Sequence, residues 1–229
     1  MKDPLVSIII PTFNRAAFLP ATLESVLAQD YAQKEIIVVD DGSADGTFEV
    51  CKKYPVRYMR QENRGLSAAR NLGVAHCTGD LLVFIDDDDL SPAGSVTERA
   101  LQWQQDPGCA FILGRTRRFT GEPAASPDFT DPEEGVLLFS ICAALIMRSV
   151  YEALNGMDEA LHIGESEDQD FWQRLREAGH RHKFIQKVCL FYRRHSGSST
   201  RDARVRQRGM LKTLHGTIMR RRQREGNNP

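Results

Sequence analysis

The chain has 229 residues, of which 41% are hydrophobic and 27% charged, proportions that are ordinary for a globular protein. Its net charge is −1, yet residues 201–229 hold nine lysines and arginines against two acidic residues, so an acidic body precedes a basic tail. No apolar run approaches the roughly 20 residues of a membrane helix, and five scattered cysteines favour reduced thiols in a cytoplasmic protein over a disulfide framework or zinc site. We expect one folded domain over 1–200 and a tail over 201–229.

In the first ninety residues, short apolar runs alternate with stretches of helical periodicity. The expected strands cover 5–10, 35–39, 56–59 and 81–85, and the expected helices cover 20–29, 45–53 and 66–76. Pro20 suits the first turn of its helix, and Gly73 falls on the packed side of the last one. Strands that alternate with helices predict an α/β domain with a mostly parallel sheet covered by helices.

The second half of the body is less regular. We expect a helix over 91–105, a strand over 109–113, a return to the sheet over 136–147 and a short helix over 149–155. Residues 115–135 are rich in proline, glycine and charge, which predicts a long surface loop.

A second acidic cluster precedes another predicted helix. The spacing of Phe171, Trp172 and Leu175 is helical, so Glu167 and Asp168 stand at the start of that helix, where its dipole favours ionised carboxylates. Capping of the helix is the simpler interpretation of the other acidic residues in this region, namely Glu165, Asp170 and Glu177.

Four consecutive aspartates, Asp86 to Asp89, follow the strand expected over 81–85. Like charges at such close range raise one another's pKa values unless a cation or hydrogen-bond donors compensate. Carboxylate oxygens are ligands that Mg²⁺ or Mn²⁺ prefers. An acidic loop that caps the next helix is an equally good interpretation of this run alone. Because ligands bind outside the carboxyl ends of strands in open α/β sheets, the polar segments that follow the first, second and fourth strands are expected to gather there.

Four segments together resemble the glycosyltransferase family 2 pattern, in order and in spacing. They are Val6-Ser7-Ile8-Ile9-Ile10-Pro11-Thr12-Phe13-Asn14-Arg15, Asp40-Asp41-Gly42-Ser43, Asn63-Arg64-Gly65-Leu66-Ser67-Ala68-Ala69-Arg70-Asn71 and Asp86-Asp87-Asp88-Asp89. Glu167-Asp168, followed by Arg174 and Gly179, is similar to the later Glu-Asp motif of the family. The resemblance extends nearly to residue 200 and does not cover the tail.

The resemblance implies a GT-A type fold, a single α/β domain with a Rossmann-like sheet, in which 1–90 bind a nucleotide-diphosphate sugar and 91–200 carry acceptor binding and catalysis. It implies Asp88 of the Asp-x-Asp motif as the main ligand of Mn²⁺ or Mg²⁺, with His195 in a Tyr-Arg-x-His setting as a further contact to metal or diphosphate. The residues implied for the donor are Pro11, Thr12, Asn14, Arg15, Asp41, Arg70, Asp86 and Asp87. If the Asp-x-Asp motif is aligned with the aspartate run one residue earlier, Asp87 takes the place of Asp88 as the metal ligand.

The implied reaction is transfer of one sugar, with inversion, to a hydroxyl acceptor such as a lipid-linked or cell-surface glycan precursor, as in polysaccharide biosynthesis. Asp168 is the implied catalytic base, and Arg70 or Arg193 is expected to add a bidentate contact to the diphosphate. Phe13 stands where many relatives carry tyrosine. Phenylalanine lacks the hydroxyl group of tyrosine but keeps an aromatic face on which the nucleobase stacks. A UDP-sugar is the first expectation for the donor, and the tail and 115–135 are candidates for acceptor recognition.

Other interpretations have specific weaknesses. A sugar nucleotidyltransferase would carry a glycine-rich loop after the first strand, and a Rossmann dehydrogenase would carry G-x-G-x-x-G there, whereas residues 11–15 contain no glycine. A non-catalytic nucleotide-sugar scaffold is opposed by the presence of Asp168. The acidic body opposes a nucleic-acid binder.

The tail is expected to be a basic helix that carries Val205, Leu211, Leu214 and Ile218 among many arginines. Such a helix is able to make peripheral contact with an anionic membrane at the inner face of the cell envelope. Packing against its own domain, or solvation, is the simpler expectation.

Overall fold

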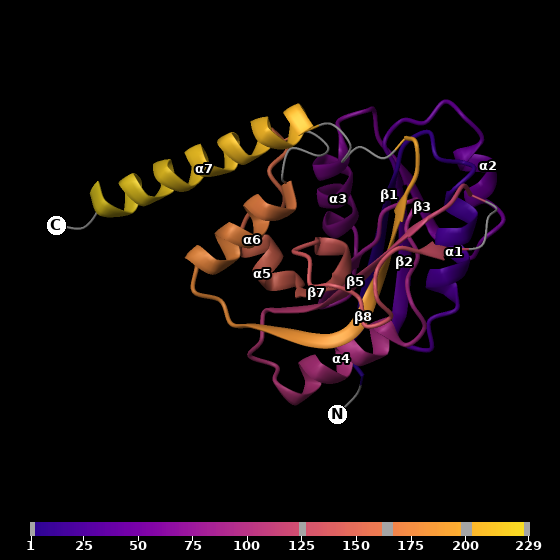
Figure 1. The fold of residues 1–229 in the computed structure, drawn as a ribbon, viewed down its shortest axis with the longest axis horizontal. Helices are drawn as coiled ribbons and strands as arrows, with labels where there is room; N and C mark the ends of the chain where they lie inside the picture. Colours follow the sequence, from indigo (N-terminus) through magenta and orange to yellow (C-terminus); the bar gives the residue numbers. More distant parts are fainter. Residues whose placement is uncertain (1–2, 124–126, 162–166, 198–202, 227–229) are drawn as a thin grey trace.

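The computed structural model describes residues 3–123, 127–161, 167–197 and 203–226 (Figure 1). Its elements in chain order are β1 (Val6–Thr12), α1 (Leu19–Leu27), β2 (Lys34–Asp40), α2 (Thr47–Cys51), β3 (Arg57–Arg60), α3 (Leu66–Ala75), β4 (Leu81–Phe84), α4 (Ser95–Gln105), β5 (Phe111–Thr120), β6 (Asp128–Phe129), the 3-10 turn η1 (Ile141–Ala143), β7 (Ala144–Met147), α5 (Arg148–Ala153), α6 (Glu167–Glu177), β8 (His182–Arg194) and α7 (Ala203–Gly226).

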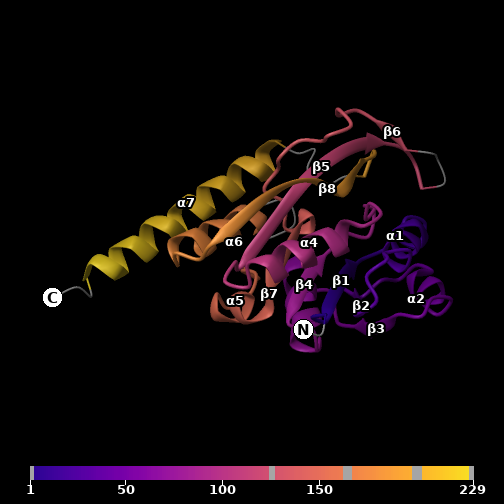
Figure 2. The ribbon, with the colours of Figure 1, turned by 90° about the horizontal axis from the view of Figure 1, so that it is seen from below.

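One mixed sheet organises the described residues, with strand order β3-β2-β1-β4-β7-β5-β6 and with β8 paired to β5. The pairs β3/β2, β2/β1, β1/β4 and β5/β8 are parallel, whereas β7 runs antiparallel between β4 and β5. Figure 2 shows the long strands β5 and β8 side by side. The α/β class and the mostly parallel sheet are therefore confirmed.

The core lies where the sequence is most continuously apolar. All seven residues of β1 and all four of β4 are buried, as expected for parallel strands that are covered on both faces. Helix α3 contacts β1 and β2, and Gly73 allows this approach, because a Cβ atom there would lie 2.5 Å from Ile9 Cγ2. The five cysteines are free and buried.

The order in which strands are added to the sheet reverses beside β1. From β1 the chain moves outward through β2 to β3, and then returns through α3 to β4 on the other side of β1. This arrangement makes the gap between the carboxyl ends of β1 and β4 a topological switch point, the usual place for a ligand in such sheets. The segment after β1 and the aspartate run after β4 meet there.

The predicted loop over 115–135 is wrong in its first part. Strand β5 continues through Thr120, and β6 pairs with its end. The charged side chains are accommodated by neighbours: Arg117 lies over the ring of Phe129 at 3.8 Å, and Arg118 is held by Asp131. Tertiary contacts thus sustain a strand that local composition disfavours.

Two further boundaries differ from expectation. The helix expected over 91–105 begins at Ser95, after a turn, and the return to the sheet expected over 136–147 consists of an isolated bridge from Val136 to Thr116 and of β7, which begins at Ala144. Helix α6 begins at Glu167, as predicted, whereas Glu165 lies outside the described residues. The tail contains helix α7, and within the described part of the chain no helix combines the length and apolar character needed to cross a bilayer.

Candidate active site

A cavity of about 1160 Å³ opens at the carboxyl edge of the sheet. One side, here called the N-terminal side, comes from the ends of β1, β2 and β4 and the start of α3. The other, the C-terminal side, comes from β5, β8, residues 138–140 and the start of α6. Its lining comprises Pro11, Thr12, Phe13, Arg15, Asp41, Leu66, Ala69, Arg70, Asp86, Asp87, Asp88, Thr116, Arg118, Thr120, Leu138, Phe139, Ser140, Glu167, Asp168, Gln169, Leu190, Tyr192, Arg194, His195 and Ser196.

The four consecutive aspartates point to four different partners. Asp86 Oδ1 accepts a hydrogen bond from Arg70 Nη2 at 2.8 Å, and Asp87 Oδ2 accepts one from the backbone N–H of Phe13 at 3.3 Å. Asp88 Oδ2 lies 2.9 Å from Nε2 of His195. The first three residues of the run line the cavity.

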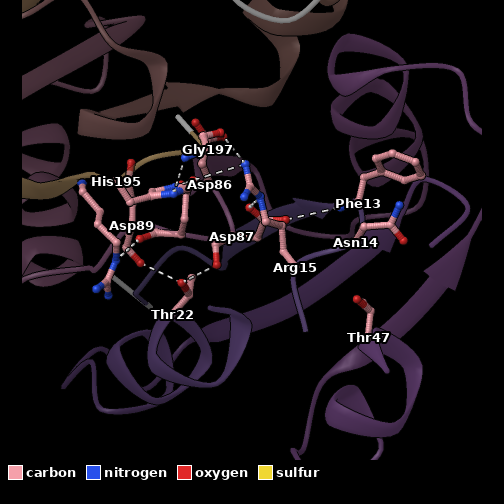
Figure 3. Close-up of polar contacts among 12 residues, drawn as sticks. Phe13, Asn14, Arg15, Thr22, Thr47, Asp86, Asp87, Asp89, His195 and Gly197 are labelled. Atoms are coloured by element: carbon pink, nitrogen blue, oxygen red, sulfur yellow. Dashed lines mark hydrogen bonds and ion pairs between the residues drawn. The ribbon is translucent and has the colours of Figure 1, made fainter. Parts of the chain in front are cut away.

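Asp89 points away from the cavity. It is fully buried, and its Oδ1 accepts a hydrogen bond from the backbone N–H of Arg193 at 2.8 Å. Figure 3 shows Asp89 close to Thr22, whose hydroxyl lies 2.7 Å from the Asp89 carbonyl oxygen and 2.9 Å from that of Asp87. Asp89 therefore fastens the aspartate run to β8 and α1, and only Asp86, Asp87 and Asp88 face a ligand.

The electrostatics of the run favour a cation. Burial and the charge of Asp88 raise the pKa of Asp87 well above its usual value. Burial also raises the pKa of Asp88, against the hydrogen bond from His195 that favours its ionised form. Positive charge is close by, because Arg15 lies 3.9 Å from Asp87 (Figure 3) and 4.0 Å from Asp88. Further positive charge would let these carboxylates ionise fully.

The pair formed by Asp88 and His195 fits a divalent metal. Carboxylate and imidazole are both ligands for Mn²⁺, and two ligands about 2.1 Å from one ion, at a right angle, lie about 3 Å apart. The separation of 2.9 Å between Asp88 Oδ2 and His195 Nε2 is that of a hydrogen bond, and it is also compatible with this spacing. Among the described residues no group of three or more His, Cys, Asp or Glu side chains is arranged to hold a metal.

Arg70 joins the two sides of the cavity. Its side chain is 1% exposed, and it donates hydrogen bonds to Asp86 at 2.8 Å and to Asp168 Oδ1 at 3.1 Å. Although burial of the guanidinium opposes its charge, the two carboxylates raise the pKa of Arg70. Arg70 also lines the cavity, and the donor contact predicted for it stays a prediction.

Asp168 is fixed at both carboxylate oxygens. Oδ1 accepts from Arg70, and Oδ2 accepts from the backbone N–H of Ile141 at 3.0 Å. A carboxylate has about four acceptor positions, so an acceptor remains available to the cavity, where the side chain is 21% exposed. Burial raises the pKa of Asp168 and the charge of Arg70 lowers it, with a net rise above the usual value of aspartate. A raised pKa strengthens a general base that must still be ionised near neutral pH.

Most residues predicted for the donor line the N-terminal side, but their roles differ. Asp41 Oδ1 accepts from the backbone N–H of Arg64 and Oδ2 from that of Gly65, both at 2.8 Å, so this carboxylate also orders the loop before α3. The Phe13 ring is 41% exposed at the rim. Asn14 is not among the lining residues; its Oδ1 accepts from the N–H of Ala44 and its own N–H donates to Ser43 Oγ, and its predicted donor contact stays a prediction.

Arg193 and Arg194 at the end of β8 differ in their surroundings. Arg193 is buried, and it donates to the carbonyl oxygens of Asp88 and Glu122, whereas the contact to a diphosphate expected of it stays a prediction. Arg194 is exposed and lines the cavity together with Tyr192. Successive side chains on a strand alternate between its faces. This rule, applied to residues 192–194, would have separated the two arginines once the strand was recognised.

The sequence prediction missed most of the C-terminal side. Thr116, Arg118 and Thr120 of β5 line the cavity at alternate positions, and Leu138, Phe139 and Ser140 complete the rim beside α6. The only signal for β5 was its threonine and phenylalanine content within a charged segment. The proposal that 115–135 take part in acceptor recognition gains support from these three β5 positions.

The comparisons with known proteins agree with this arrangement. The model of the family described as glycosyl transferase family 2 matches residues 7–152. The chain belongs to glycosyl transferase family 2. Among curated relatives, EpsJ of Bacillus subtilis, an uncharacterized glycosyltransferase, is 31% identical over 219 residues, covering 86% of this chain and 63% of EpsJ. Glycosyltransferase GlyA of Streptococcus pneumoniae is 40% identical over 94 residues, covering 39% of this chain and 14% of GlyA. This family 2 chain thus spans less than two thirds of either relative.

Solved structures confirm the GT-A type fold of this family 2 chain. The mannosyltransferase PcManGT from Pyrobaculum calidifontis, in complex with GDP-Man and Mn²⁺, superposes with a TM-score of 0.71 at 21% identity, covering 96% of this chain and 65% of PcManGT. Residues 1–349 of Staphylococcus aureus TarS, in complex with UDP-GlcNAc, give 0.70 at 19% identity, with 87% and 61% covered. The fold is the feature that these structures share with this chain.

Proposed function

We propose that this protein is a metal-dependent inverting glycosyltransferase that moves one sugar from a nucleotide-diphosphate sugar to a hydroxyl acceptor. The observation that carries the proposal is that Asp168 and the Asp88–His195 pair line one and the same cavity of about 1160 Å³. Family membership supports the same reaction class. A base and a diphosphate site that face each other are what a direct displacement at the anomeric carbon requires.

The N-terminal side is the proposed donor site. The exposed ring of Phe13 offers a face for the nucleobase, and Arg15, whose side chain is 28% exposed, offers its guanidinium to phosphate oxygens. Asp88 and His195 would hold Mn²⁺ or Mg²⁺, which when bound supplies Lewis-acid stabilisation of the charge on the diphosphate. A UDP-sugar remains the first candidate, and a GDP-sugar is the second because PcManGT was solved with GDP-Man.

The C-terminal side is the proposed acceptor site. An acceptor hydroxyl placed beside Asp168 attacks the anomeric carbon, its proton passes to the Asp168 carboxylate, and the bond from the anomeric carbon to the diphosphate oxygen breaks with its electron pair leaving on oxygen. Arg70 holds Asp168 in place during this step. One displacement of this kind inverts the configuration at the anomeric carbon.

The proposed acceptor is a lipid-linked or cell-surface glycan precursor. It is suggested by one relative, 34% identical over 134 residues, which is the putative teichuronic acid biosynthesis glycosyltransferase TuaG of Bacillus subtilis. The rim residues Leu138 and Phe139 and the guanidinium of Arg194 offer apolar and positively charged contacts for such a substrate.

Release of nucleoside diphosphate tests the proposed reaction. The protein is incubated with UDP-, GDP- and TDP-sugars, with and without Mn²⁺, and Asp168→Asn serves as the control for turnover. We expect Mn²⁺-dependent release from one class of donor, reduced by about 10²- to 10⁴-fold in the variant. Binding of a donor without release would support a scaffold, and release that is unchanged in the variant would exclude Asp168 as the base.

A further inference from the structure

Among the side chains of helix α7 that the structure describes, those turned to the body are small or polar. Between residues 209 and 220, leaving aside position 210, whose side chain is not described, the buried or half-buried positions are Gly209, Thr213, Gly216, Thr217 and Arg220. At about 100° per residue, these five positions form one stripe along the helix.

Ion pairs from Arg220 hold this stripe of α7 against α6. Arg220 Nε donates to Glu177 Oε2 at 2.9 Å, and Arg220 Nη1 donates to Asp170 Oδ1 at 3.4 Å. Both acidic partners belong to α6, whose carboxylate side chains here are 5–7% exposed. These pairs fix which side of α7 turns to the body and which turns outward.

The outward side of α7 is apolar. Leu211, Leu214 and Ile218 are 63%, 57% and 41% exposed, and their spacing of three and four residues places them in one row. A helix at the surface of a globular domain normally buries its apolar row and exposes its polar side. Among the described side chains of α7 the apolar row is the exposed one, and a contiguous exposed apolar row of this kind marks an interaction surface.

The charge around this row indicates what covers it. Residues 201–229 hold nine lysines and arginines against two acidic residues, and exposed Lys212 and Arg222 flank the row. A second α7 placed against the row by a two-fold axis would bring the same positive charges together. An anionic bilayer accepts both features, since apolar side chains enter its interface and basic side chains meet its head groups.

We propose that the outward face of α7, formed by Leu211, Leu214 and Ile218, docks on an anionic lipid bilayer. Figure 1 shows α7 extending from the body as an arm, which leaves this face accessible. The contact is peripheral, and it does not depend on the proposed transferase activity. If both hold, docking brings the cavity close to acceptors that are embedded in the bilayer.

Vesicle flotation tests the proposal with the full chain. Vesicles of phosphatidylcholine alone are compared with vesicles that also contain phosphatidylglycerol, for the unaltered protein and for the variant Leu211→Gln/Leu214→Gln/Ile218→Gln. The matched control is Leu101→Gln, because Leu101 lies on α4 and is 46% exposed. We expect binding to the anionic vesicles only, weakened by added salt, and lost by at least about tenfold in the α7 variant but not in the control.

The other outcomes overturn the proposal. Absence of binding, equal binding to neutral vesicles, or equal binding by the α7 variant would each contradict it. A concentration-dependent dimer that dissociates in the α7 variant, measured by light scattering, would assign the row to a second copy instead. The substituted side chains are exposed, so the melting temperature is expected to stay unchanged, and its measurement verifies that the variant is folded.

Discussion

Arg70 donates one hydrogen bond to Asp168 and another to Asp86, so a single buried guanidinium ties the proposed base to the carboxyl end of β4. Asp168 belongs to α6 and Asp86 follows β4, and the two are 82 positions apart in the sequence. The distance between the acceptor side and the donor side of the cavity is thereby fixed by one side chain. Arg70 acts as a positioning residue.

Replacing Arg70 tests this positioning role. In Arg70→Met the base loses its fixed place, and we expect kcat to fall by about 10²-fold, with a smaller loss in Arg70→Lys. Because the Arg70 charge lowers the pKa of Asp168, its removal shifts the acid limb of the kcat/KM profile to higher pH. Arg174→Met is the matched control, since the half-buried Arg174 also supports α6 but pairs with Asp170 instead. A higher KM for the donor with an unmoved pH profile would show that Arg70 contacts the donor directly.

The unaltered protein should also show a characteristic pH dependence. A base works only when it is ionised, so activity falls as the pH drops through its pKa. Since burial raises the pKa of Asp168 above that of an ordinary aspartate, we expect the acid limb of kcat/KM at a higher pH than the usual value of about 3.9. Steady-state rates from pH 4 to pH 9 measure this limb. A flat profile down to pH 4 would contradict a buried carboxylate as the base.

The aspartate run is expected to divide into ligand-binding and structural positions. Asp89→Ala leaves the backbone N–H of Arg193 buried without its acceptor, and we expect a loss of about 1–3 kcal/mol in the free energy of unfolding. Asp88→Ala removes a carboxylate from a crowded cluster, and its effect on stability is expected to be smaller. Urea denaturation of both variants measures the difference, and equal losses would contradict the division.

Gly73 provides a test of the fold beneath the site. In Gly73→Ala the new methyl group would lie 2.5 Å from Ile9 Cγ2 and 3.3 Å from Val39 Cγ2, so α3 must move away from the sheet. We expect a destabilisation of about 1–3 kcal/mol from this overpacking. Gly46→Ala is the control, because its nearest neighbour would be Ala16 Cβ at 3.8 Å. Thermal melting of both variants gives the comparison, and equal melting temperatures would contradict the tight contact.

The sequence predicts the N-terminal side of the site well and the C-terminal side poorly, for a physical reason. Continuous apolar strands such as 81–85 end at carboxylates, and parallel topology then brings those ends together. On the C-terminal side, β5 carries arginines whose charge is met by Phe129 and Asp131. Both partners lie outside the predicted strand, so local composition resembles a loop.

Individual side-chain roles were the least predictable feature. Arg70 and Asn14 stand in recognisable motifs, yet whether such a side chain meets a ligand or the protein itself depends on contacts distant in sequence. For Arg70 the contact is with Asp168, and for Asn14 it is with the segment after β2. Spacing within a motif does not encode these pairings.

Isothermal titration of UDP, GDP and TDP, each with and without Mn²⁺, tests most directly the claim that this cavity is a metal-dependent donor site. The titration is made on the unaltered protein and on Asp88→Ala. We predict that one of these diphosphates binds only in the presence of Mn²⁺, and that the variant loses this binding. Absence of binding under every condition, or binding that neither Mn²⁺ nor the variant changes, would contradict the claim.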